Sequence, residues 1–262
     1  MKKFCSTSKT MLMAVLLLLS VGTNAQQRKK VASPKTSTSF VKRPKLPIEY
    51  VQERNLGAVT DDNKSSEYAN LSYSKYIMPK GAHIPSPEEW CGIFPLNGVM
   101  TFEGDDIVQD NYEVVTVGGE TYTFESDYQR NDRICYALRF KDEKKDFLCA
   151  YRYKRMGRFV ADSPDSGVEV QVIYLGPSFK GNLETISNEN YWQKNKSKVI
   201  RRYFPIPGFR RNDGFNITDS RGKQAYYWSS QANIVLQINI EGVSSDKLAP
   251  VFLTVTRPFD NQ

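Results

Sequence analysis

The sequence predicts an α+β domain that is mostly antiparallel β-structure, with one or two short helices. Three observations support this prediction. Short segments of alternating apolar and polar residues recur along the chain, whereas apolar residues at helical spacing appear in only two stretches. No segment repeats with a period of roughly 20 to 50 residues, so neither a solenoid nor a propeller is expected. Residues 48–262 contain no linker rich in Pro, Gly and Ser, which indicates a single domain.

The clearest strand is Val168–Gly176. Its valines alternate with Glu169 and Gln171, and this two-residue period predicts a strand with one buried face. Two further apolar segments, Ile134–Phe140 and Asp146–Tyr153, flank the polar sequence KDEKK and therefore predict a β-hairpin.

A second hairpin is expected near the end of the chain. The apolar segments Asn233–Gly242 and Ala249–Pro258 lie on either side of Val243–Leu248, which would form the connection. Pro258 suits the end of a strand, because proline cannot donate to the middle of a sheet. We expect both hairpins to lie in the same sheet.

Helical signals are confined to two stretches. In HIPSPEEWCGIF, Ser86 can cap a helix and Glu89 completes a capping box. Trp90 and Phe94 then share one face at the spacing of a helical turn. The second stretch, Asn182–Trp192, would direct three apolar side chains inward: Leu183, Ile186 and Trp192.

The first 25 residues predict a secretory signal peptide. Three lysines accompany the apolar run MLMAVLLLLSVG, and Thr23-Asn24-Ala25 offers small residues at the cleavage point. The run is shorter than the roughly 20 residues that cross a bilayer. Because Cys5 precedes the run and does not stand at the cleavage point, lipid attachment is not expected. The sequence thus predicts an exported protein that is not a lipoprotein.

Residues 26–47 predict a basic, flexible arm ahead of the domain formed by residues 48–262. The arm is rich in Pro, Ser and Thr and has no acidic residue. Of the 36 basic residues ten precede Ile48, whereas all 29 acidic residues follow it, so the domain itself is slightly acidic. This distribution does not favour a nucleic-acid-binding protein. The arm is either a solvated linker or a contact for anionic envelope lipids or polysaccharide.

Three cysteines follow the signal peptide. In the predicted hairpin Cys135 and Cys149 are placed directly opposite each other about a turn centred on Asp142, which predicts a disulfide if that register holds. Cys91 is left over and is expected to be a small buried residue of the helix.

Signals for catalysis are few. The chain has a single histidine, His83, and any Ser-His-Asp triad or Cys-His pair would have to use it. Oxygen ligands for calcium occur in clusters at residues 61–63, 104–106 and 213–214, but none completes a known loop signature. A pair of carboxylates for glycoside hydrolysis is not identified by the sequence. We therefore expect no catalytic residue, no metal site and no cofactor.

The sequence YYWSS, Tyr226–Ser230, permits two interpretations. Its aromatic rings and hydroxyls could form a platform on which a ligand stacks. Alternatively, Trp228 could pack in the core, with the serine hydroxyls bonded to buried main-chain groups.

Several segments occur in a characteristic order and together carry a resemblance: EYVQERNLG, HIPSPEEWCGIFP, YALRF followed by CAYRY, VIYLGPSF, RRYFPIPGFR, YYWSS and TVTRPF. Over most of residues 48–262 the chain resembles the Fibrobacter succinogenes major paralogous domain and its fimbrillin-associated relatives. The resemblance implies a C-type-lectin-like fold and an exported, non-enzymatic role in adhesion. The chain departs from the family before YYWSS, where DSRGKQA replaces a glycine-rich stretch, and this weakens the case for sugar binding.

With this resemblance we expect Trp90 and Trp228 to be core aromatics. The candidate ligand face consists of Phe209, Arg210, Tyr226 and Tyr227. The expected function is an exported binding module of the cell surface or envelope, an adhesin or a fimbria-associated protein. The alternative is a structural component of an envelope assembly, docked through the basic arm. Expected partners are an envelope or fimbrial protein, or a host or matrix ligand, with no nucleic acid and no membrane span.

Overall fold

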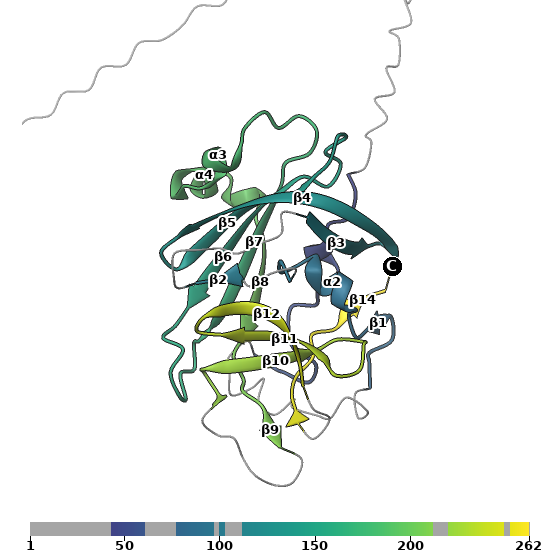
Figure 1. Ribbon diagram of the computed structural model, residues 1–262, viewed down its shortest axis with the longest axis vertical. Coiled ribbons are helices and arrows are strands. Elements are labelled where there is room, and N and C mark those ends of the chain that lie inside the picture. The colour runs from purple at the N-terminus through teal and green to yellow at the C-terminus, as the bar shows by residue number, and fades with distance from the viewer. Residues whose placement is uncertain are drawn as a thin grey trace, which may run out of the picture. The chain divides into compact units, whose positions relative to one another are not determined.

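The computed structural model in Figure 1 describes residues 43–60, 77–96, 100–102, 112–211, 220–248 and 252–261. They all belong to one compact unit, Lys42–Gln262. The predicted signal peptide and the predicted arm up to residue 42 lie outside the described residues. Within the described ranges, no helix has the length and apolar character needed to cross a membrane.

The larger sheet is an antiparallel meander in which each strand pairs with the next one along the chain. Its six strands are β3 (Tyr112–Val117), β4 (Glu120–Asn131), β5 (Ile134–Lys141), β6 (Cys149–Met156), β7 (Gly167–Tyr174) and β8 (Ile200–Pro205). The tight turn between β3 and β4 uses Gly118 and Gly119, whose φ angles of 65° and 79° glycine adopts without steric cost. β5 and β6 form the first predicted hairpin.

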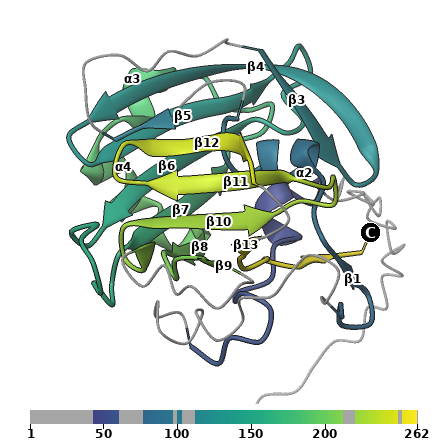
Figure 2. The same cartoon turned by 60° about the horizontal axis from the view of Figure 1, so that its bottom comes forward.

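A second antiparallel sheet has the strand order β10-β11-β12-β2. Its strands are β10 (Gln224–Trp228), β11 (Ile234–Asn239), β12 (Gly242–Lys247) and β2 (Met100–Thr101). Figure 2 shows β10, β11 and β12 stacked over the larger sheet. Side chains from both sheets, among them Val170 and Tyr227, belong to one buried cluster. The hydrophobic core therefore lies between the two sheets.

Two short strand pairs lie outside these two sheets. β1 (Ala82–His83) pairs with β14 (Phe259–Asp260), and β9 (Arg210–Arg211) pairs with β13 (Phe252–Leu253). Both pairs are antiparallel, so the described structure is α+β with mostly antiparallel strands, as the sequence predicted. The C-type-lectin-like part of that expectation rests on the resemblance alone and stays a prediction.

The first predicted helix is α2 (Pro87–Cys91), and its capping box is confirmed. Ser86 Oγ accepts a hydrogen bond from the Glu89 N–H at 3.1 Å, and Glu89 Oε2 accepts one from the Ser86 N–H at 2.8 Å. The helix ends at Cys91, before Phe94. Trp90 points from α2 into the core, where its ring lies 6.1 Å from that of Phe204.

The second predicted helix, residues 182–192, is in fact two helices. α3 (Leu183–Ile186) ends at Ser187, and Asn188 then caps α4 (Glu189–Lys194) by accepting a hydrogen bond from the Tyr191 N–H at 2.9 Å. Asparagine favours such cap positions, which explains why one helix gives way to another here. Two 3-10 helices, η1 (Pro47–Glu49) and η3 (Lys196–Lys198), complete the helical elements of the described part.

β7 is buried on both faces, not on one as predicted. α3 and α4 cover the outer side of the larger sheet (Figure 1), where Trp192 and Ile186 pack into a second apolar cluster. Gln171 is buried there as well, because Arg152 lies over the Trp192 ring and donates from Nε to Gln171 Oε1 at 2.9 Å. A polar side chain on an alternating strand can thus face a covered surface.

The second predicted hairpin is wrong. Residues 243–247, expected to be its connection, belong to β12, which pairs with β11. The turn lies earlier, where Asn239 Oδ1 accepts hydrogen bonds from the N–H groups of Glu241 and Gly242. Gly242 is required there, because a Cβ atom would stand 1.9 Å from Met100 O. β11 and the β5–β6 hairpin also lie in different sheets, contrary to the prediction.

The compact unit begins earlier than the predicted boundary at Ile48. Leu46 is fully buried, and Arg43 donates to both oxygens of the Glu49 carboxylate at 2.6 and 2.8 Å. Residues 43–47 therefore belong to the folded unit and not to a flexible arm, because burial of Leu46 fixes them against the core.

A buried ion pair fastens α2 to the larger sheet. Arg139 of β5 donates from Nε to Glu113 Oε2 of β3 at 3.1 Å. Its Nη1 also donates to the carbonyl of Ile93 and to the hydroxyl of Tyr153, both at 2.9 Å. Carbonyls beyond the end of a helix lack helical partners, so this guanidinium satisfies them from the sheet.

Candidate functional site

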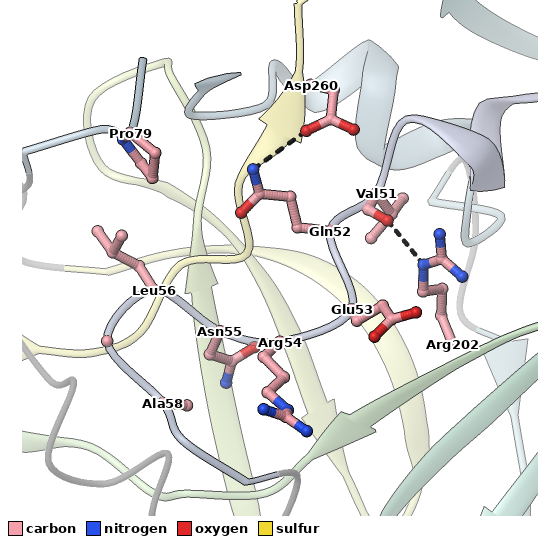
Figure 3. Close-up of a pocket in the computed structure, with 11 residues that line it drawn as sticks. Val51, Gln52, Glu53, Arg54, Asn55, Leu56, Ala58, Pro79, Arg202 and Asp260 are labelled. Carbon is pink, nitrogen blue, oxygen red and sulfur yellow. Dashed lines mark hydrogen bonds between the residues drawn. The ribbon is translucent and has the colours of Figure 1, made fainter. Parts of the chain in front are cut away.

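A surface cleft forms where four parts of the chain meet. Its volume is about 580 Å³, and it is lined by residues 51–58 together with Pro79, Arg202 and Asp260. Figure 3 shows Arg202 and Glu53 on one side and Leu56 and Pro79 on the other. The volume lies within the range of roughly 300–1,000 Å³ typical of small-ligand sites.

The wall formed by residues 51–58 follows the C-terminal segment. The Gln52 N–H donates to Pro258 O at 3.0 Å, and the Leu56 N–H donates to Thr256 O at 3.0 Å. The wall turns at Gly57, whose φ of 79° is readily adopted by glycine. Main-chain hydrogen bonds therefore hold this loop in one position.

Arg257 lies beneath the cleft and joins its parts. The residue is fully buried and donates from Nε to Asn55 Oδ1 at 2.7 Å. Its Nη1 donates to Gln52 O at 3.2 Å and its Nη2 to Tyr203 O at 2.9 Å. The guanidinium also lies over the Phe204 ring, 4.9 Å from the centroid. One side chain thus fixes the loop, the C-terminal segment and the edge strand β8 together.

Charged groups of both signs line the cleft. Arg202 donates from Nε to Val51 O at 2.6 Å and from Nη1 to Arg201 O at 2.8 Å. No carboxylate of the described residues lies within ion-pair distance of it. Burial lowers the pKa of its guanidinium, while the negative charges of Glu53 and Asp260 act against that shift. A cation held only by main-chain carbonyls keeps its attraction for an anionic group of a ligand.

The two carboxylates that line the cleft differ in their hydrogen-bond partners. Gln52 Nε2 donates to Asp260 Oδ1 at 3.0 Å, as the dashed line in Figure 3 shows, whereas the exposed Glu53 carboxylate has no hydrogen-bond partner in the described part. The site can therefore accept hydrogen bonds from a ligand at Glu53 and donate to it at Arg202. Such a donor and acceptor set suits a polar or zwitterionic ligand.

Asn55 contributes a buried donor without a partner. Its side chain is 3 % exposed, and Oδ1 is fixed by Arg257, yet Nδ2 has no hydrogen-bond partner among the residues that the structure describes. An unsatisfied buried donor costs roughly 1–3 kcal/mol. The residue that carries this cost, Asn55, is part of the wall of the cleft.

The predicted ligand face is largely buried. Tyr227 is fully buried and donates its hydroxyl to Pro205 O at 2.6 Å, so it faces the core, contrary to the prediction. Tyr226 is 8 % exposed, and its hydroxyl accepts hydrogen bonds from Gln224 and Gln237. The alternation of a strand sends Tyr226 and Tyr227 to opposite faces of β10, which prevents them from forming one platform.

Phe209 and Arg210 are half-buried. The Phe209 ring packs edge to face on Tyr226, with centroids 4.9 Å apart. The structure thus brings Phe209 and Tyr226 together, but as part of a small apolar cluster on the outer face of the second sheet. The cleft contains none of the four predicted residues.

The two tryptophans expected in the core are both 1 % exposed. Trp90 donates from Nε1 to Trp228 O at 3.2 Å, so the indole has the partner that burial requires. The Trp228 ring packs in the outer cluster with Val235 and Leu248, and not in the main core. Ser229 Oγ donates to Ile234 O at 2.8 Å and closes the turn to β11. YYWSS is therefore mainly a structural segment.

The predicted disulfide is absent, since Cys135 and Cys149 are both free and buried. Cys135 is paired with Tyr153 and Cys149 with Arg139, so the turn centres on Lys144, two residues later than expected. The cysteines lie four residues apart along the strands, about 13 Å, which exceeds disulfide range.

Burial also makes the cysteines poor nucleophiles. It raises the pKa of the Cys91 thiol to about 11 and that of Cys135 to about 12. The third thiol, Cys149, has its pKa raised by burial as well. Nucleophilic attack requires the thiolate, which is scarce at neutral pH in such sites.

His83 serves the fold. Its Nε2 lies 2.9 Å from Glu89 Oε1, and its Nδ1 lies 3.0 Å from Asn261 Oδ1. These contacts join the segment before α2 to the C-terminal strand pair. Among the described residues, no three His, Cys, Asp or Glu side chains gather as metal ligands. The clusters at residues 61–63, 104–106 and 213–214 lie outside the described residues.

The sequence did not reveal the cleft because residues that contact each other in its wall are far apart in the chain. Gln52 and Asp260 are separated by 208 residues and Val51 and Arg202 by 151. The one available signal was that EYVQERNLG, RRYFPIPGFR and TVTRPF all belong to the segments that carry the resemblance, and these three meet at the cleft.

No curated protein and no solved structure matches the chain. The resemblance to the Fibrobacter family therefore stays a prediction. A family model matches residues 43–249, which cover most of the chain and include the cleft wall and β8. The chain belongs to the family described as a domain of unknown function, DUF8237.

Proposed function

We propose that the protein is an exported, non-enzymatic binding module of the cell surface or envelope, an adhesin or a fimbria-associated protein. In this proposal the partner is an envelope, fimbrial, host or matrix protein, and the cleft is the contact site. The observation that carries it is Arg202, a guanidinium in the cleft whose hydrogen-bond partners among the described residues are main-chain carbonyls.

The rigidity of the cleft supports a binding role. Arg257 and the main-chain bonds of residues 52–56 hold the wall before any ligand arrives. A preformed site loses little conformational entropy on binding. A polar segment of a partner could place a carboxylate at Arg202 and a donor at Glu53.

The adjacent arginines Arg201 and Arg202 provide a matched test. Arg202 lines the cleft, whereas Arg201 is exposed. Arg201 lies opposite Gln171 in the β7–β8 register, on the outer face of the sheet. The probes are arrays of envelope proteins, fimbrial proteins, matrix proteins and glycans. Arg202→Gln should weaken binding to the proteins that the parent captures by about tenfold or more, the effect of one charge-assisted hydrogen bond.

The control is Arg201→Gln, which should bind like the parent. Both variants need unchanged melting curves. Equal binding by parent and Arg202→Gln would refute the cleft as the contact site. Capture of glycans alone would contradict a protein partner.

Export is tested separately. N-terminal sequencing of the protein from envelope material should find Gln26 as the first residue, without lipid, as Thr23-Asn24-Ala25 predicts. A start far from Gln26, or an acylated residue, would contradict the proposed location.

A further inference from the structure

A second pocket lies beside Arg43, the first described residue of the compact unit. Its volume is about 570 Å³, and it opens beside the start of β8. Its lining includes two cations and no acidic side chain, and consists of Arg43, Tyr174, Leu175, Ser178, Ser197, Lys198 and Ile200. The cleft differs in composition, because its lining includes both acidic and basic side chains.

The pocket continues into a lysine-rich turn. Lys194, Lys196 and Lys198 lie at the end of α4 and in η3, and all three are exposed. Their side chains have no hydrogen-bond or ion-pair partner in the described part. No acidic residue occurs between Lys194 and Arg202 in the sequence. Cations grouped without counter-charges create a positive potential that attracts anions.

Arg43 is held in place at the pocket. Its guanidinium bonds both oxygens of Glu49 and lies 5.6 Å from the centroid of the Tyr174 ring. In the sequence Arg43 directly follows a segment that has five basic residues and no acid between Gln26 and Lys42. Arg43 is therefore a fixed cation in the lining of this pocket, next to a basic stretch of the sequence.

We propose that this pocket and the lysine-rich turn form a docking site for an acidic polysaccharide. The anionic groups of the polymer are bound by Lys194, Lys196 and Lys198, and one sugar unit enters the pocket. There the hydroxyls of Ser178 and Ser197 can bond sugar hydroxyls. The site is independent of the cleft and shares with the proposed function only the expectation of export.

Two observations favour a polysaccharide over other polyanions. A membrane surface is bound through exposed apolar side chains as well as cations, yet the exposed large apolar side chains of the described residues all lie outside the pocket and the turn. Single-stranded nucleic acid needs open aromatic faces for stacking. Here Arg43 covers Tyr174, and Lys45 lies 3.7 Å from the centroid of the Tyr50 ring.

The experiment compares two triple variants of residues 26–262 with equal charge change. In the first, Lys194, Lys196 and Lys198 are replaced by Gln, and in the control Lys80, Lys223 and Lys247 are replaced by Gln, all exposed. The probes are heparin and polygalacturonate, which separate sulfate from carboxylate, with neutral dextran as a blank. The first variant should bind at least one acidic polymer roughly tenfold more weakly than the parent, and the control within about twofold.

A second variant tests the pocket without a charge change. Ser178→Leu should narrow the pocket and weaken binding several-fold, with an unaltered melting curve. If it binds like the parent, sugar entry into the pocket is wrong. Equal losses in both triple variants, or no binding of either acidic polymer by the parent, would overturn the site. Tighter binding to vesicles of anionic phospholipid than to both polymers would assign it to a membrane.

Discussion

Arg139 and Arg257 are both fully buried, yet they stabilise two very different regions. Arg139 lies in an enclosed region, where Glu113 is 1 % exposed and the C-terminal end of α2 completes the hydrogen bonds. Arg257 lies beneath an open cleft and binds neutral oxygens of Asn55, Gln52 and Tyr203. The first arrangement buries its charges away from any ligand. The second holds the wall of the cleft, the proposed binding surface, in position.

The two regions are joined by aromatic contacts. Tyr153, which bonds Arg139, stacks on Phe94 with ring centroids 5.8 Å apart. Phe94 contacts Phe204 at 5.0 Å, and Phe204 carries the Arg257 guanidinium on its face. The core thus forms a continuous packed base from the enclosed region to the cleft, and the proposed binding surface lies at its open edge.

The largest effect is expected at Arg139. Arg139→Met leaves Glu113 buried without its cation, and breaking such a pair destabilises a protein by roughly 3–5 kcal/mol. The measurement is the free energy of unfolding from a urea titration, with Arg201→Met as an exposed control that should change it by less than about 0.5 kcal/mol.

A double variant sharpens this test. Arg139→Met with Glu113→Leu removes both charges, so it should recover much of the lost stability. No recovery would mean that the carbonyl contacts beyond α2, and not the ion pair, are the main role of Arg139.

A smaller and more local effect is expected at Arg257. Arg257→Lys keeps the charge but loses the planar fork that reaches Asn55, Gln52 and Tyr203 together. The expected loss is roughly 1–3 kcal/mol. Hydrogen exchange should accelerate at the amides of Gln52 and Leu56 and stay unchanged in β5 and β6. If hydrogen exchange accelerated equally at Gln52, Leu56, β5 and β6, the effect of Arg257 would not be confined to the cleft, and the two regions would not differ in this respect.

Local signals in the sequence predicted much of the fold. The capping box at Ser86 and Glu89 and the polar turn between β5 and β6 act over a few residues, so they can be identified without the tertiary structure. β12 was missed because its sequence GVSSDK is polar, and pairing with β11 makes it a strand despite that composition.

The candidate site was less predictable. Tyr226 and Tyr227 were predicted to bind a ligand because they are adjacent aromatic residues, but both side chains are buried. Arg202 and Asp260 line the cleft because strand β8 and strand β14 both lie beside the loop of residues 51–58. The periodicity of apolar residues in the sequence does not predict contacts between residues so distant in the chain.

At the enclosed region a moderate effect is expected from the start of α2. Ser86→Ala removes the hydroxyl that accepts from the Glu89 N–H, and loss of such a cap costs about 1 kcal/mol. Ser86→Asp should restore the stability, because aspartate also caps helices. If Ser86→Ala unfolds at the same urea concentration as the parent, α2 is held by Arg139 and core packing alone.

The smallest effect is a pH dependence at Glu49, beside the second pocket. Burial raises the pKa of its carboxyl, but the hydrogen bonds from Arg43 and the Leu46 N–H outweigh burial and place it below the ordinary value of 4.5. A lowered pKa means that the folded state favours the carboxylate. Its stabilisation is full above pH 4.5 and is lost as the pH falls through the folded-state pKa.

Glu49→Gln should therefore destabilise the protein by roughly 0.5 kcal/mol at pH 7, the scale of a partly exposed ion pair. The difference from the parent should shrink as the pH falls below 4.5, because the parent then loses the same charge. Urea titrations of both proteins at pH 7 and pH 3 measure it. A difference that stays constant between these pH values would show that the Glu49 carboxylate contributes nothing through its charge. Burial of Leu46, and not the charge of Glu49, would then fix the first described residues against the core.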